Sequence, residues 1–196
     1  MKSVSSLILP PVIRPFIILL TLLSAGCKTE PAAQTNVAAS LIAETLTIQP
    51  ARAFTVGIRL KMKPGWHTYW KEPGDSGLAT SVRWTLPAEF KAGEIQWPQP
   101  ERFQDSAGVT YGYTGEIILP VEITPPQTLN ENDKITIVAE VKWLECSDIC
   151  VVGKANLTLT LPSAQTAPLL NPETQKLFAD TRTKIPTQPN TKNRRK

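Results

Sequence analysis

No apolar run in this 196-residue sequence reaches the roughly 20 residues that a membrane-spanning helix needs. The apolar run at 16–23 is far shorter, and Pro10, Pro11 and Pro15 interrupt any longer helix. A helical period is missing as well, except for a weak one at 172–181, and no segment is repeated. Since helices and strands do not alternate along the chain, the sequence weighs against a thioredoxin or dinucleotide-binding fold.

Acidic residues are absent after Asp180, and this makes the formal net charge of +4 misleading. Eight of the basic residues lie in the first 26 positions or beyond Asp180. Between residues 28 and 180, 13 basic residues stand against all 17 acidic ones, a net charge of −4. This central part is therefore mildly acidic, and nucleic-acid binding loses its main support. We expect the segment 163–196, which is basic and rich in Pro, Thr and Asn, to be a disordered, solvated tail.

Residues 1–26 are typical of a bacterial export signal. Lys2 and Arg14 precede the short apolar run, and small residues at 24–26 lead to Cys27. The ending LLSAGC resembles the lipobox of bacterial lipoproteins, in which the cysteine is acylated, for example with palmitate, and becomes the mature N-terminus. Ser24 stands where that pattern prefers leucine. The alternative is an ordinary cleaved signal with an incidental cysteine.

A lipid anchor on Cys27 would leave two of the three cysteines free to pair with each other. It would also place the protein in an oxidising compartment outside the cytoplasm, where a thiol pair can cycle or lock. Lys28 follows Cys27 where enteric bacteria use Asp to retain lipoproteins in the inner membrane, which favours the outer membrane. Residues 27–40 are expected to form a flexible tether.

Period-two alternation of apolar residues dominates positions 41–162 and predicts an all-β domain. The alternating runs lie at 54–62, 82–86, 117–123, 135–143 and 157–161, with shorter candidate strands at 44–48, 66–70 and 94–97. Turn residues rich in Pro, Gly, Asn and Asp separate them. Seven or eight strands in about 120 residues are typical of an antiparallel sandwich of immunoglobulin-like type.

Cys146 and Cys150 lie in the connection between two predicted strands, and their spacing leaves three interpretations open. A structural disulfide would close a loop of only five residues, which contributes about 2 kcal/mol in the chain-entropy model. A redox pair would use one exposed thiol to attack and the other to resolve the mixed disulfide. A metal site would add a soft ligand such as His67 or Met62 and hold Cu(I). His67 and Met62 alternate with strand residues, so both also fit a packed core.

Four blocks in order resemble the N-terminal periplasmic domain of the DsbD and ScsB thiol:disulfide interchange proteins. They are PGWHTYWKEPGDSGLATSVRWTLP at 64–87, IQWPQPERF at 95–103, YGYTGEIILPVEI at 111–123 and WLECSDIC at 143–150. The resemblance implies an immunoglobulin-like fold and a redox-active Cys146–Cys150 disulfide that needs no cofactor. It implies that Cys150 attacks and Cys146 resolves. The expected partners are a thioredoxin-like donor, a separate transmembrane electron source and oxidised periplasmic proteins.

Members of that family also shield the cysteines with a cap loop that contains an aromatic residue and an acid. The matching stretch is RFQDSAG at 102–108, with Phe103 and Asp105 as candidate cap residues, although their order and spacing differ from the family pattern. The expected function is thus extracytoplasmic thiol–disulfide exchange, as a component of a thiol:disulfide oxidoreductase system. The alternatives are a binding or scaffold module with a structural disulfide, and a periplasmic Cu(I)-binding protein.

Overall fold

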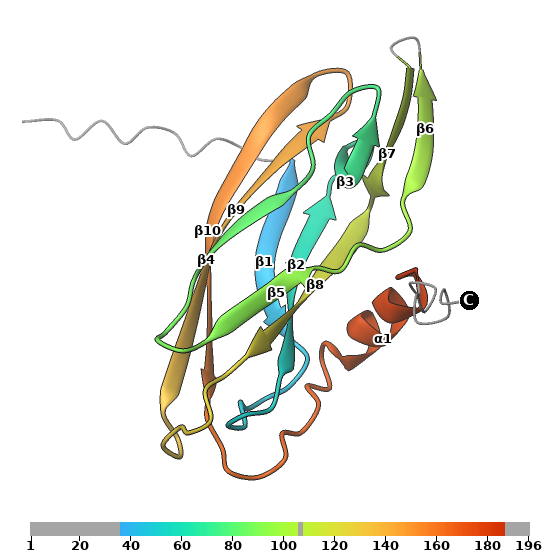
Figure 1. Ribbon diagram of the computed structural model, residues 1–196. Coiled ribbons are helices and arrows are strands. Elements are labelled where there is room, and N and C mark those ends of the chain that lie inside the picture. The colour runs from blue at the N-terminus through green and yellow to red at the C-terminus, as the bar shows by residue number, and fades with distance from the viewer. Residues whose placement is uncertain (1–35, 106–107, 187–196) are drawn as a thin grey trace, which may run out of the picture. The chain divides into compact units, whose positions relative to one another are not determined.

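The computed structural model describes residues 36–105 and 108–186. They form two antiparallel β-sheets packed face to face, followed by one short helix (Figure 1). This confirms the all-β, immunoglobulin-like sandwich that the alternation predicts. In the part of the chain described, no helix has the length and apolar character needed to cross a membrane.

The smaller sheet contains four strands in the order β1-β2-β8-β5. They are β1 (Val37–Ala43), β2 (Phe54–Met62), β5 (Lys91–Ile95) and β8 (Glu116–Thr124). The long alternating runs at 54–62 and 117–123 thus form the two central strands, since their apolar positions share one face that can be buried.

The larger sheet contains six strands, with the order β10-β9-β3-β7-β6, and β4 also pairs with β9. They are β3 (His67–Gly74), β4 (Ser81–Thr85), β6 (Glu101–Asp105), β7 (Gly108–Thr114), β9 (Lys134–Cys146) and β10 (Cys150–Pro162). The longest pairing joins β9 to β10 without a register shift. This hairpin forms one side of the sheet and carries the cysteines at its turn.

The hydrophobic core lies between the facing surfaces of the two sheets. Its inward side chains from β2, β8 and β9 have no exposed surface: Val56, Ile58, Leu60, Leu119, Val121, Ile123, Ile137, Ala139 and Val141. Burial of one aliphatic side chain of this size contributes about 1.5–3 kcal/mol. The sandwich therefore holds together through apolar packing that does not depend on the cysteine pair.

The N-terminal strand starts earlier than the sequence indicates. Val37–Ala43, mostly expected to be tether, pairs along its whole length with β2 and buries Val37 and Ala43. The strand expected at 44–48 forms only isolated bridges, at Thr45 and Ile48. Small residues hide β1 from an alternation analysis, because its pairing rests on backbone hydrogen bonds more than on side-chain pattern.

Residues 163–186 pack on the sandwich, so the expectation that a disordered tail begins at 163 is wrong for this stretch. Ala164 N–H donates to Ile48 carbonyl oxygen at 2.9 Å, and the chain then leads to helix α1 (Gln175–Thr183). The weak helical period at 172–181 is the sequence signal of this helix. Residues 187–196 lie outside the described part.

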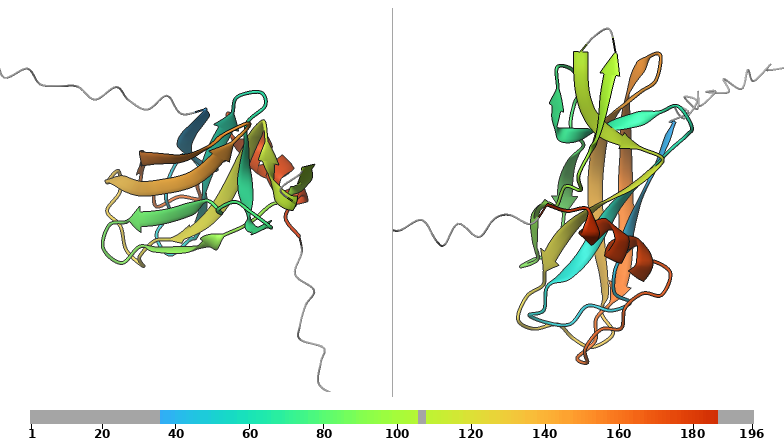
Figure 2. Two further views of the ribbon diagram at one scale, coloured as in Figure 1. Left: turned by 90° about the horizontal axis from the view of Figure 1, so that it is seen from above. Right: turned by 90° about the vertical axis from the view of Figure 1, so that its right-hand side faces the viewer.

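Helix α1 covers the outer face of β2 and β8, on the side of the smaller sheet away from the core (Figure 2, right). Its Phe178 has no exposed surface. A Cβ atom at Gly57 would lie 3.0 Å from the Phe178 ring and 2.6 Å from the Ile118 side chain. Glycine at position 57 therefore leaves the space that the phenyl ring occupies.

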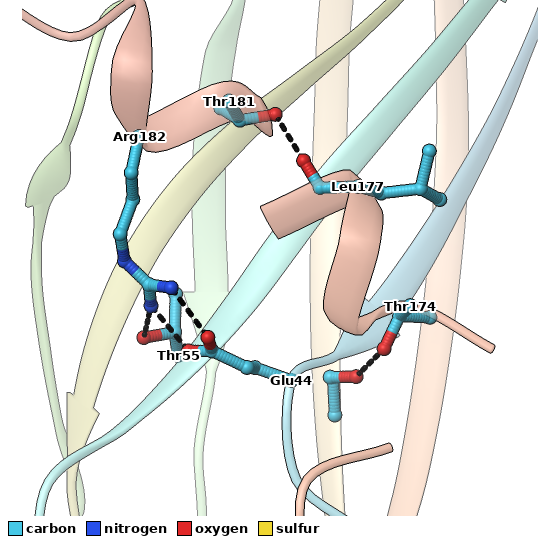
Figure 3. A network of polar contacts seen from close by, with 7 residues as sticks. Glu44, Thr55, Thr174, Leu177, Thr181 and Arg182 are labelled. Carbon is cyan, nitrogen blue, oxygen red and sulfur yellow. Dashed lines mark hydrogen bonds and ion pairs between the residues drawn. The ribbon is translucent and has the colours of Figure 1, made fainter. Parts of the chain in front are cut away.

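Polar contacts fix both ends of the helix to the smaller sheet (Figure 3). The Arg182 guanidinium donates two hydrogen bonds to the Glu44 carboxylate and lies 3.4 Å from the Thr55 hydroxyl. The hydrogen bond from Arg182 lowers the pKa of Glu44 below its ordinary value. At the other end, the Thr174 hydroxyl donates to Ala43 carbonyl oxygen at 2.6 Å.

If this segment belongs to the cooperative unit, Phe178→Ala should reduce the free energy of unfolding by about 3–5 kcal/mol, the usual cost of removing a buried phenyl ring. Urea denaturation followed by tryptophan fluorescence measures the change. Leu169→Ala is the control, since Leu169 lies in the same segment but is 73% exposed, and it should change stability by less than about 0.5 kcal/mol. Equal stability of Phe178→Ala and the parent chain would contradict the assignment.

Candidate functional site

The cysteines close the β9–β10 hairpin. The two strands pair from Lys134↔Pro162 to Cys146↔Cys150, so the cysteines are directly opposite each other, separated by the turn at 147–149. A disulfide joins them, with Cα atoms 4.1 Å apart. The turn lies at the same end of the sandwich as the outer ends of β6 and β7 (Figures 1 and 2). The site is therefore part of a rigid sheet and is not carried by a long loop.

The two sulfur-bearing residues differ sharply in exposure. Cys146 is 2% exposed, whereas Cys150 begins β10 on the protein surface. Apolar neighbours of Cys150 are also exposed, at 63% for Ile149, 40% for Val151 and 68% for Val152. An incoming group can reach Cys150 far more easily than Cys146, and it meets an apolar surface there.

Aromatic residues of neighbouring strands lie beside the buried cysteine. His67 of β3 pairs directly with Cys146, and directly opposed residues share one face of a sheet. The His67 ring lies 5.1 Å from the Tyr69 ring and 5.0 Å from the Phe103 ring, and its Nε2 is 3.2 Å from the Tyr69 hydroxyl. These rings form an aromatic cluster on the same face as the disulfide.

The β3–β4 connection packs against this aromatic cluster. Gly77 has a φ of +106°, and a Cβ atom there would lie 2.3 Å from the Tyr69 ring. Glycine therefore lets the backbone of the connection rest directly on Tyr69, which is 4% exposed. The next residue, Leu78, is 61% exposed and adds a further apolar side chain to the surface.

Glu145 holds the hairpin from the inner side. Strand alternation turns it away from Cys146 and toward the core, where it has no exposed surface. Its carboxylate accepts hydrogen bonds from Asn36 N–H and from Trp143 Nε1, both at 2.8 Å, and from Asn36 Nδ2 at 3.3 Å. Asn36 directly precedes β1, so this carboxylate links the cysteine hairpin to the start of the smaller sheet.

The remaining predicted residues are only partly brought to the site. Phe103 lies on β6 within the aromatic cluster. It pairs with Thr110 of β7, although the sequence predicted a cap loop at this position. Asp105 ends the same strand, but its side chain lies outside the described part. Cys27 lies outside it as well, so lipidation and the export signal stay predictions.

The structure does not bring all the candidate ligands of the metal alternative together. Within 36–105 and 108–186, no group of three or more His, Cys, Asp or Glu side chains is placed to hold a metal ion. Met62 is 5% exposed in the core on β2, 4.0 Å from the Thr68 hydroxyl, and it does not share the disulfide face of the larger sheet. The exposed apolar residues beside Cys150 were not singled out from the sequence, although the run Ile149–Val152 was a visible signal.

The sequence model described as "Thiol:disulfide interchange protein DsbD, N-terminal" matches residues 37–162. The chain belongs to the DsbD N-terminal domain family. The match spans β1 to β10 and includes both cysteines of the hairpin, while the segment with α1 lies beyond it. Comparison with curated protein sequences gives no match.

The solved structure of a ScsB domain supports the same fold. The N-terminal periplasmic domain of ScsB from Proteus mirabilis is 21% identical, with a TM-score of 0.55 over 76% of this chain. The chain spans about half, 54%, of that ScsB chain. The reduced DsbD N-terminal domain of Neisseria meningitidis is 10% identical, with a TM-score of 0.28 over 67% of this chain and 90% of that one. The latter likeness carries no weight in the assignment.

The difference in exposure predicts unequal reactivity after reduction. Cys150 should react with iodoacetamide at least about ten times faster than Cys146 in the folded domain, because alkylation requires access to the thiolate. Brief labelling of the reduced protein, followed by peptide mass spectrometry, measures both rates. Labelling in urea is the control and should bring the rates together. Faster labelling of Cys146 in the folded domain would contradict the assignment.

Proposed function

We propose that this protein is an extracytoplasmic thiol–disulfide exchange component that passes electrons from a thioredoxin-like donor to oxidised proteins through Cys146 and Cys150. The observation that carries the proposal is the asymmetric disulfide, which joins an exposed Cys150 to a buried Cys146 at the end of a rigid hairpin. Exchange needs one accessible sulfur and one that stays close enough to resolve the intermediate. Membership of the DsbD N-terminal domain family supports the same chemistry.

Reduction of the protein starts at the exposed sulfur. A thiolate of the donor attacks Cys150 Sγ, a mixed disulfide forms, and Cys146 leaves as a thiolate that takes up a proton. The donor's second thiolate then attacks the sulfur of the donor's first cysteine, which is bonded to Cys150 in the mixed disulfide. This forms the donor's disulfide and releases Cys150 as a thiolate that takes up a proton. The donor ends as a disulfide and the protein as a dithiol, so two electrons have moved.

Delivery reverses these bonds on another protein. The Cys150 thiolate attacks a disulfide of the acceptor, and one acceptor sulfur leaves and is protonated. Cys146 then attacks Cys150 Sγ, which reforms the intramolecular disulfide and releases the second acceptor thiol. The direct opposition of Cys146 and Cys150 across the hairpin keeps the resolving sulfur in reach throughout.

The aromatic cluster of His67, Tyr69 and Phe103 supports a protective role. It lies beside Cys146 on the disulfide face and limits access of small oxidants to the resolving thiol. We infer that Phe103 and Asp105 act as cap residues at this end of the sandwich. A docked partner would then reach the site through Cys150 and its apolar surroundings.

The place of action is part of the proposal. The export signal and the LLSAGC pattern support acylation of Cys27, which would hold the domain on a bacterial membrane, with the outer membrane favoured. The ScsB domain from Proteus mirabilis is periplasmic, in keeping with this location. A transmembrane module would supply electrons to the thioredoxin-like donor.

The competing function is a binding module in which the disulfide is structural. The short loop between the cysteines argues against it, because closing five residues adds only about 2 kcal/mol to a domain that already buries a large core. Under this alternative, replacing both cysteines by serine leaves function intact and lowers stability only modestly.

A Cys146→Ser variant should trap a mixed disulfide between Cys150 and a reacting thioredoxin-like protein, because the resolving thiol is gone. Non-reducing electrophoresis and mass spectrometry of the linked peptide identify the bond. The matched control is Cys150→Ser, which leaves only the buried sulfur and should trap at least about tenfold less. If neither variant forms the adduct while both remain folded, the exchange function is wrong.

A further inference from the structure

Three basic side chains surround one carboxylate on the outer face of the larger sheet. Glu140 of β9 lies 2.9 Å from Lys154 Nζ, 3.2 Å from Arg83 Nη2 and 3.4 Å from Lys142 Nζ. Hydrogen bonding from Lys154, with smaller effects of Arg83 and Lys142, lowers the pKa of Glu140 to about 2. The carboxylate is therefore ionised at neutral pH, and this basic cluster still carries two uncompensated positive charges.

The basic cluster is open to solvent and unfavourable for the sheet itself. Lys142 and Lys154 are directly opposite in the β9–β10 register, and like charges in that position destabilise a sheet. Glu140 is shared among three cations and offsets the repulsion only in part. The side chains of Arg83, Lys142 and Lys154 are 78%, 53% and 51% exposed and line an open hollow of about 600 Å³.

The cluster shares its sheet face with the disulfide. Lys142 is four residues from Cys146 on β9, and Lys154 is four residues from Cys150 on β10. Even spacing along a strand keeps the side chains on one face, and four residues span about 13 Å. Only Leu144 and Val152 occupy the outward row between them, so an apolar strip separates the basic cluster from the sulfurs.

A protein docked at the disulfide would also cover part of the basic cluster. A standard interface buries about 800 Å² on each partner, which as a disc has a radius of about 16 Å. Centred on Cys150, this disc includes Lys142 and Lys154 near its edge. Charges at the rim of an interface mainly change the association rate and its salt dependence.

Resting on the exchange function proposed above, we propose that the basic cluster guides the thioredoxin-like partner, which presents carboxylates next to its own reactive cysteine. Ile149 and Val152 then contact apolar surface around the partner's cysteine, while Lys142 and Lys154 attract its acidic rim. An anionic membrane surface is the less favoured occupant, because membrane-binding clusters usually combine four to eight cations and this one has three, partly neutralised.

Replacing Lys142 and Lys154 by Gln should slow reduction of the disulfide by a reduced thioredoxin of net negative charge. We expect a three- to tenfold loss, about the effect of removing rim charges, at about 0.01 M ionic strength, where the Debye length is about 30 Å. The loss should disappear at about 1 M, where the Debye length is about 3 Å. Acid quenching, alkylation and mass spectrometry follow the rate in the full-length domain.

The control variant replaces Lys61 and Lys91, exposed lysines of the smaller sheet, and makes the same change in net charge. It should react like the parent protein. Dithiothreitol, a neutral reductant, should reduce all three proteins equally. If the native disulfide resists dithiothreitol, the exchange function is wrong. If dithiothreitol reduces the disulfide readily but thioredoxin does not, or if thioredoxin reduces all variants at equal rates, only the docking surface is wrong.

Glu140→Gln tests the same proposal in the opposite direction. It leaves three cations without their carboxylate and should accelerate the thioredoxin reaction at low ionic strength, with circular dichroism checking the fold. Equal slowing by both lysine pairs would assign the effect to overall charge and overturn the proposal. The proposal would also be overturned if the Lys142/Lys154 variant lost binding to phosphatidylglycerol vesicles while its rate of reduction by thioredoxin stayed unchanged.

Discussion

The thirteen-pair ladder between β9 and β10 is the constraint on which the site depends. It places Cys146 and Cys150 opposite each other, and its alternation turns Glu145 inward in the same step. Because Glu145 accepts hydrogen bonds from Trp143 and from Asn36, the end of the hairpin stays joined to the start of the smaller sheet. The backbone ladder and the buried carboxylate hold the cysteines in place whether or not their sulfurs are bonded, which is what repeated opening and closing requires.

The same hairpin also makes the two sulfurs chemically unequal. Cys146 lies beside the aromatic cluster of β3 and β6, whereas Cys150 begins the strand at the edge of the sheet and has few neighbours that could cover it. An edge strand is normally protected from other chains by charge or by covering segments. Here the edge strand carries apolar side chains next to Cys150 and the basic Lys154 four residues farther along. This combination suits a transient contact with another protein.

Alternation predicted β2, β8 and β9, which bury one face, together with the second half of β10, and it placed the cysteine pair at a hairpin turn. It failed where pairing depends on the backbone: β1 is built of small residues, and β6 is polar and pairs at the edge of its sheet. The packing of α1 depends on Phe178 meeting Gly57, residues far apart in sequence, which no local pattern reveals. Glu145 directly precedes Cys146 in the sequence, yet strand geometry points its side chain to the opposite face of the sheet.

The central claim is that the Cys146–Cys150 bond opens and closes within a folded domain at potentials available to other proteins. Equilibration of the protein in glutathione redox buffers, with thiol alkylation to measure the reduced fraction and near-ultraviolet circular dichroism to follow tertiary packing, tests it most directly. We expect a reduction potential above about −300 mV and an unchanged circular dichroism spectrum. A potential below that value, or a bond that opens only as the sandwich unfolds, would contradict it.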